Sequence, residues 1–152
     1  MLEPAPTTQI DPELARGRLA RIVEATATKP AYVVLEFANT DYQTHLLPHG
    51  SVPDWLGERV GKRVVGTIRA DAKRIDVTET GGKYVEPVFG RPRRLQGRVI
   101  SRNAGGNTLT IHCGFPVIVK PTAPGQKAEG FSVGDFVAFD VKRGATFEAK
   151  QA

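Results

Sequence analysis

The segment GKRVVGTIRADAKRIDV, residues 61–77, alternates apolar and polar side chains over most of its length. A period of two is the pattern of a β-strand that buries one face. Residues 63–70 and 74–78 therefore predict two strands, separated by a turn at 71–73. Gly66 lies in the middle of the first of them, where a sharply bent strand is expected.

The same order of patterns occurs twice in the chain. GDFVAFDVKRGATFEA, residues 134–149, repeats the strand–turn–strand pattern of 61–77, and GRVISRN at 97–103 echoes GRLARIV at 17–23. Between these ends, each copy has two more strand-like segments, followed by a connector. The segments are AYVVLEFAN (31–39) and YQTHLL (42–47) in the first copy, and TLTIHCG (108–114) and FPVIVK (115–120) in the second. Each copy therefore predicts five strands, as an internal duplication would produce.

Five short strands with a connector between the third and the fourth are typical of the OB-fold, a small Greek-key barrel. We therefore predict an all-β protein of two tandem five-stranded OB-like barrels, related by the internal repeat and packed on each other. SH3-like barrels and one continuous β-domain remain open as alternatives. The predicted boundaries are 1–16 for an N-terminal tail and short helical turn, 17–78 for the first barrel, 79–96 for a basic linker and 97–150 for the second barrel.

Two short helical turns are predicted outside the strands. Asp11 as N-cap, Pro12 at the first helical position and Gly17 after the last indicate one turn of helix. Residues 51–61 break the strand alternation and predict a second turn. We expect three apolar side chains of this turn to cover one end of a sheet: Trp55, Leu56 and Val60.

The closing segment VGDFVAFDVKRGATFEA, residues 133–149, resembles the last strands of OB-fold domains of the cold-shock type. In that family, Gly-Asp or Gly-Gln opens an alternating strand, and a basic-Gly turn leads to a short final strand. Cold-shock domains also carry RNA-binding aromatic residues on their second and third strands, which the matching segments 108–114 and 115–120 lack. The resemblance therefore implies an OB fold rather than the activity of that family.

The composition indicates a folded protein with an anionic partner. Of the 152 residues, 40% are hydrophobic and 24% are charged, as in ordinary folded domains. The formal net charge of +5 favours RNA, DNA or an acidic protein as the partner. The sequence shows no secretory signal and no apolar run long enough to span a bilayer, so we expect a cytoplasmic protein that makes no membrane contact.

Residue types that carry catalysis or bind metals are not grouped in recognisable motifs. The sequence has no P-loop, no G-x-S-x-G and no H-E-x-x-H pattern, so we expect a non-enzymatic protein without a cofactor. The only cysteine, Cys113, excludes an internal disulfide and a cysteine-based zinc site. Strand alternation places His112 and Cys113 on opposite faces, so these two side chains cannot share a metal ion.

The segment GGKYVEPVFGRPRRLQGRV, residues 81–99, interleaves basic and aromatic side chains. Cations neutralise phosphates and aromatic rings stack on bases, so this composition suits nucleic acid. The basic turns of the two repeats are expected to frame the ligand face of an OB barrel. The candidate nucleic-acid-binding residues are Lys83, Tyr84, Phe89, Arg91, Arg93, Arg94, Arg69, Lys73, Arg74, Lys142 and Arg143.

Two functions remain open at this point. The first is the binding of single-stranded RNA or DNA with low sequence selectivity through a basic surface. The second is a protein-interaction or assembly module, in which Tyr84 and Phe89 pack between the barrels and the arginines are only solvated. A continuous basic face would favour nucleic acid, whereas an apolar patch opposite the linker would favour a protein partner.

Overall fold

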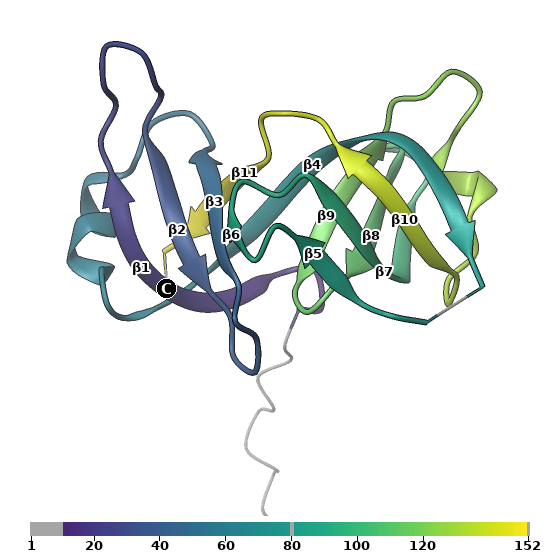
Figure 1. Ribbon diagram of the computed structural model, residues 1–152, viewed down its shortest axis with the longest axis horizontal. Coiled ribbons are helices and arrows are strands. Elements are labelled where there is room, and N and C mark those ends of the chain that lie inside the picture. The colour runs from purple at the N-terminus through teal and green to yellow at the C-terminus, as the bar shows by residue number, and fades with distance from the viewer. Residues whose placement is uncertain (1–10, 80, 152) are drawn as a thin grey trace, which may run out of the picture.

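The computed structural model describes residues 11–79 and 81–151, and these residues form an all-β protein (Figure 1). Two short 3₁₀ helices, η1 and η2, interrupt the succession of strands. In chain order the elements are β1 (Ala15–Val23), β2 (Tyr32–Glu36), β3 (Gln43–Pro48), η1 (Asp54–Arg59), β4 (Arg63–Thr78), β5 (Tyr84–Glu86), β6 (Phe89–Gly90), β7 (Arg94–Asn103), β8 (Thr108–His112), β9 (Pro116–Pro121), η2 (Ala128–Gly130), β10 (Phe136–Val141) and β11 (Thr146–Lys150).

Hydrogen bonds join the eleven strands of the described residues into one mixed sheet. Its main path runs β1-β2-β3-β11-β4-β10-β7-β8-β9, while β5 pairs with β7 and β6 pairs with β3. In Figure 1, β1–β3 lie at one end of the long axis, β7–β10 lie toward the other, and β4 runs between them. The all-β class is thus confirmed, but a tandem of two separate barrels is not confirmed, because every strand belongs to the same sheet.

The long strand β4 has different neighbours along its length. Its first part pairs with β1 and β11, and its last part pairs with β10. Residues 69–72 in its middle also run parallel to β9. As a result, β1, β2, β3 and β11 form one circuit of pairing with the start of β4, and β7, β8, β9 and β10 form a second circuit with its end.

The turn predicted at residues 71–73 is wrong, because β4 continues through them without a break. Ala70 and Ala72 are buried, while Asp71 and Lys73 are exposed, so the strand alternation persists across the segment. The backbone there is held by β9, with Asp71 opposite Lys120. The composition of Asp71-Ala72-Lys73 suggested a turn, but the buried alanines and the parallel partner keep the chain extended.

The two circuits of pairing share local details at matching places of the sequence pattern. In β1 the register against β2 shifts between Leu19 and Arg21, and in β7 the register against β8 shifts between Val99 and Ser101. Gly61 N donates to the Leu19 carbonyl at 2.7 Å, and Gly134 N donates to the Val99 carbonyl at 2.8 Å. Both glycines have positive φ, which side chains disfavour and glycine tolerates.

Three other predictions of local structure need correction. The segment that begins at Asp11 forms a hydrogen-bonded turn rather than a helix, although the Asp11 carboxylate does accept a bond from Glu13 N at 2.9 Å. The turn ends there because β1 begins at Ala15 and pairs with β4. The second turn, η1, is confirmed and buries Leu56, but Val60 is 43% exposed because it follows η1 in an extended conformation. The predicted tail at residues 1–10 lies outside the described residues.

The basic linker predicted at 79–96 also has regular structure. Its described part contains β5 and β6, and β7 begins within it at Arg94. The pairing of β6 with β3 brings Phe89 opposite Gln43, so this segment lies against the first group of strands. The linker therefore places its side chains on a fixed surface.

The core is continuous across the sheet and explains the strand pattern. Val33, Leu35 and Phe37 of the first repeat are buried, as are Leu109 and Ile111 of the second. Phe37 and Phe115 stack with ring centroids 3.9 Å apart, which joins the two halves of the core. None of the helices in the described part of the chain has the length and apolar character that a bilayer crossing requires.

Candidate functional site

The outward face of β2 and β3 carries aromatic side chains. Because side chains alternate along a strand, the burial of Val33 and Leu46 in the core turns Tyr32 and His45 to the opposite face. The rings of Tyr32 and His45 stack there, with centroids 4.8 Å apart and planes 21° from parallel. The register of these two strands thus builds an aromatic platform.

Phe89 from β6 extends this platform. Its ring and the His45 ring form a T-shaped contact, with planes 75° apart and centroids 4.7 Å apart. Phe89 is 55% exposed. The guanidinium carbon of Arg21 lies 6.0 Å from the centre of the Phe89 ring. An exposed ring with a cation beside it can stack on a planar ligand and hold an anionic group.

The environment of His45 favours its uncharged form. Burial lowers the pKa of its imidazole, and the positive charge of Arg21 lowers this pKa further. The Nε2 atom of His45 is buried and has no hydrogen-bond partner among the described residues. The ring therefore acts in the free protein as an uncharged aromatic surface beside cations.

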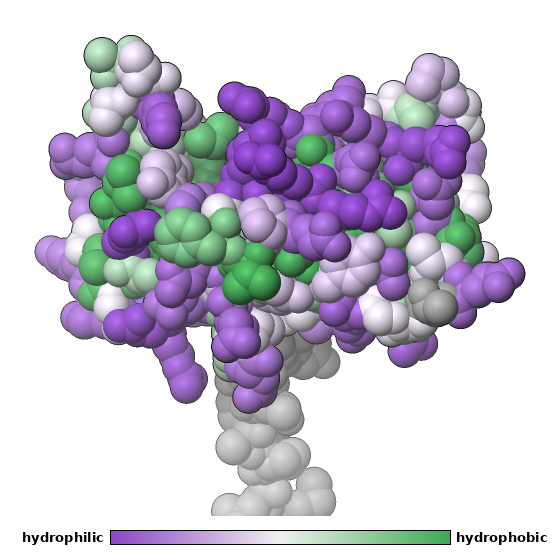
Figure 2. Space-filling model, in the orientation of Figure 1, coloured by the Kyte–Doolittle hydropathy of each residue, from purple (hydrophilic) through white to green (hydrophobic). Residues whose placement is uncertain are grey.

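A hollow of about 620 Å³ lies beside the platform. It is bounded by the ends of β2 and β3, the β1–β2 connection, the segment before β7 and the turn between β10 and β11. Its basic lining residues are Lys29, Arg91, Arg93 and Arg143. Figure 2 shows hydrophilic side chains gathered over the middle of this face, with hydrophobic ones next to them. We call the platform and this hollow together the β2–β3 groove: Tyr32, His45, Phe89, Arg91, Arg93 and Arg143.

The three arginines of the groove are close enough to repel one another. Partial burial lowers the pKa of Arg91, and the positive charges of Arg143 and then Arg93 lower it further. None of the three forms an ion pair within the described part of the chain. Lys73 joins them around an adjacent hollow, where Asp140 is the one acidic lining residue. That aspartate pairs with Arg94, so the remaining excess of cations forms a site for an anion.

The other predicted residues lie elsewhere or are already engaged. Arg94 donates a hydrogen bond to Asp140 at 3.0 Å, and its hydrogen bonds to the Tyr84 and Asp140 side-chain oxygens raise its pKa. Arg74 pairs with Asp76 at 2.9 Å, and Lys83 Nζ lies 3.4 Å from His112 Nδ1. The remaining two, Arg69 on β4 and Lys142 after β10, are exposed outside the lining of the groove.

The sequence prediction therefore identified only part of this site. It named Phe89, Arg91, Arg93 and Arg143, and the fold brings these together from segments about 50 residues apart. It missed Tyr32, His45, Lys29 and Arg21. The available signal was strand parity, since Tyr32 and His45 fall on positions that alternate with the buried Val33, Leu35 and Leu46.

The described residues contain no side-chain group suited to metal binding and no reactive cysteine. Within residues 11–79 and 81–151, no three His, Cys, Asp or Glu side chains are grouped so that they could hold a metal ion. Burial raises the pKa of the Cys113 thiol to about 12, so this thiol is a protonated core side chain. No family model, curated protein or solved structure matches this chain.

Proposed function

We propose that the protein binds single-stranded nucleic acid, with low sequence selectivity, in the β2–β3 groove. The observation that carries this proposal is the convergence of Arg91, Arg93 and Arg143 in a hollow also lined by His45, whose ring contacts the exposed Phe89. None of the three arginines has an ion-pair partner among the described residues. A phosphate backbone would neutralise these arginines and relieve their mutual repulsion.

A single strand suits this groove better than a duplex. Tyr32, His45 and Phe89 present ring surfaces, and rings can stack only on bases that are not already stacked within a helix. Stacking depends little on the identity of the base, so we expect weak sequence preference. The alternative proposed from the sequence, a protein partner, predicts no nucleic-acid binding even at low salt.

We also propose that the two circuits of pairing are two small OB-type barrels that exchange their last strands. Support comes from the parallel pairs β3–β11 and β4–β9, which occupy equivalent positions in the two circuits. Residues 17–78 and 97–150 would then be the repeats in sequence, while β11 completes the first barrel and the end of β4 completes the second. In an OB barrel, ligands bind on strands 2 and 3 between the loops that flank them, and the β2–β3 groove has this position.

Replacing Phe89 by alanine is expected to weaken binding of a labelled single-stranded oligonucleotide by about tenfold, because one stacked base contributes about 1–3 kcal/mol. Fluorescence anisotropy at two salt concentrations measures this change. The salt dependence should stay the same, because Phe89 carries no charge.

The matched control is Val88→Ala. Val88 is the neighbouring residue, it is 51% exposed, and its backbone carbonyl bond to Gln43 N is retained in the variant. This variant should bind as the wild type does. Equal effects of the two substitutions would contradict stacking at Phe89.

A further inference from the structure

The register shift in β1 places its arginines on one face. In a regular strand, residues 18 and 21 would point to opposite sides. Here Arg18 lies opposite Glu36 and Arg21 lies opposite Val34, so the shift between them turns both side chains to the outward face of the sheet. Arg21 lies next to Phe89. The basic side chains of β1 therefore form a row that begins at the β2–β3 groove and extends along the strand.

The basic face continues from β1 onto β4 and β11. Arg18 lies opposite Arg63, and Arg16 lies opposite Val65, which in turn lies opposite Lys150. Like charges directly opposite each other on a sheet are destabilising unless a counter-charge is present. Among the described residues, Arg18 has one, the Glu36 carboxylate at 2.8 Å, and Arg63 forms no ion pair. We call this row the arginine track: Arg21, Arg18, Arg63 and Arg16.

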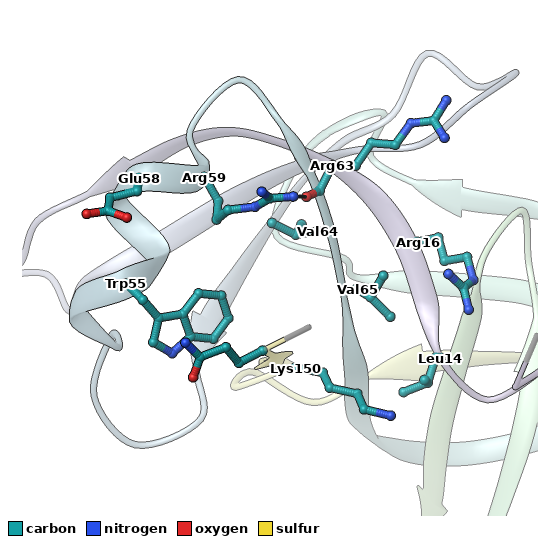
Figure 3. A pocket seen from close by; sticks show the side chains of 10 residues that line it. Leu14, Arg16, Trp55, Glu58, Arg59, Arg63, Val64, Val65 and Lys150 are labelled. Carbon is teal, nitrogen blue, oxygen red and sulfur yellow. Dashed lines mark hydrogen bonds between the residues drawn. The ribbon is translucent and has the colours of Figure 1, made fainter.

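The arginine track ends at a hollow of about 380 Å³ beside Trp55 (Figure 3). The indole points from η1 toward β4, and Arg16 lies on the other side of Val65. Arg59 is fixed by a 2.6 Å hydrogen bond from its Nη2 to the Arg63 carbonyl. The hollow is lined by one acidic side chain, Glu58, against four basic ones: Arg16, Arg59, Arg63 and Lys150. None of these four forms an ion pair within the described residues.

We propose that the bound nucleic-acid strand leaves the β2–β3 groove, follows the arginine track and places a base against Trp55. This inference rests on the proposed function and extends it to a second stacking position. From residue 21 to residue 16, an extended strand covers roughly 16 Å. Binding sites of roughly 4–16 nucleotides per OB-type unit can extend this far. Phosphates bind the unpaired guanidinium groups on the way, and the excess of cations favours a polyanion over a neutral peptide.

The test uses the fluorescence of Trp55, the only tryptophan of the chain. The full chain is titrated with single-stranded oligonucleotides of roughly 4 and 16 nucleotides, the limits of that site-size range. The long oligonucleotide should change the Trp55 emission, whereas the short one should bind in the groove and leave the emission unchanged. The double variant Arg16→Ala, Arg63→Ala should weaken binding of the long oligonucleotide by about tenfold and leave the short one unaffected.

The outcomes separate this inference from the proposed function. If neither oligonucleotide binds, the proposed function is wrong and the inference fails with it. If both bind but the long oligonucleotide does not change the Trp55 emission, the groove stands and the arginine track is refuted. Unchanged affinity for the short oligonucleotide also shows that the double variant is folded. The control variant Arg74→Ala, Lys127→Ala removes the same charge from exposed positions outside the arginine track.

Discussion

Replacing Arg91, Arg93 and Arg143 together by alanine should reduce the affinity for single-stranded nucleic acid by about a hundredfold at low salt. The three guanidinium groups line the hollow of the β2–β3 groove, and the charges of Arg143 and Arg93 act on Arg91. Each phosphate that is no longer neutralised removes roughly 0.7 from the slope of log affinity against log salt, so the slope should become shallower by about 2. Anisotropy titrations over a series of salt concentrations measure both quantities.

The control for this variant is a second triple substitution, Arg74→Ala, Lys120→Ala and Lys127→Ala. These three side chains are exposed and lie outside the groove. Either triple variant lowers the formal net charge by the same three units, from +5 to +2. If net charge alone drives binding, both variants will lose affinity equally, and the assignment of the site to the groove will be wrong.

Gly66→Ala should cost about 3 kcal/mol of unfolding free energy. Gly66 pairs with β1 on one side and with β11 on the other, opposite Ala15 and Ala149. An added Cβ would lie 2.6 Å from Cε1 of Phe147 and would also collide with the backbone oxygen of Glu148. Phe147 is buried, so its ring cannot move aside. Overpacking of this kind usually costs about 1–3 kcal/mol, and backbone contact places Gly66 at the upper end.

Urea unfolding followed by circular dichroism measures this loss. Gly57→Ala is the matched control, because no atom outside its chain neighbours and its own helix backbone lies within 4 Å of the added Cβ, and its φ is not positive. That variant should unfold within about 0.5 kcal/mol of the wild type. In the Gly66→Ala background, Phe147→Leu should recover part of the stability by removing ring atoms from the collision. Equal stability of the two glycine variants would contradict the close approach of β11 to β4.

The strands themselves were predictable because period two is a local property. Val33, Leu35 and Phe37 alternate in the sequence and are all buried in the structure. The partner of each strand was not predictable in the same way. The pattern of β11 fits the edge of either repeat, and nothing in its alternation specifies that it pairs with β3 and the start of β4. The continuity of β4 was hidden for a similar reason, since its partner β9 is about 50 residues away.

The candidate site was only partly predictable for a related reason. Composition draws attention to a local cluster, such as the arginines near Phe89. Tyr32 and His45 are isolated in the sequence, and only the register of β2 against β3 brings their rings together. Arg94 shows the opposite error, because it belongs to the basic cluster in sequence but faces Asp140 across β7 and β10.

The most direct test of the proposed groove is the mapping of backbone amide chemical shifts during titration with a single-stranded oligonucleotide at low salt. We expect the largest changes in β2 and β3, around Phe89 to Arg93, and in the turn at Arg143. Saturation without such changes, or changes confined to β8 and β9 at the other end of the molecule, would contradict the proposed function.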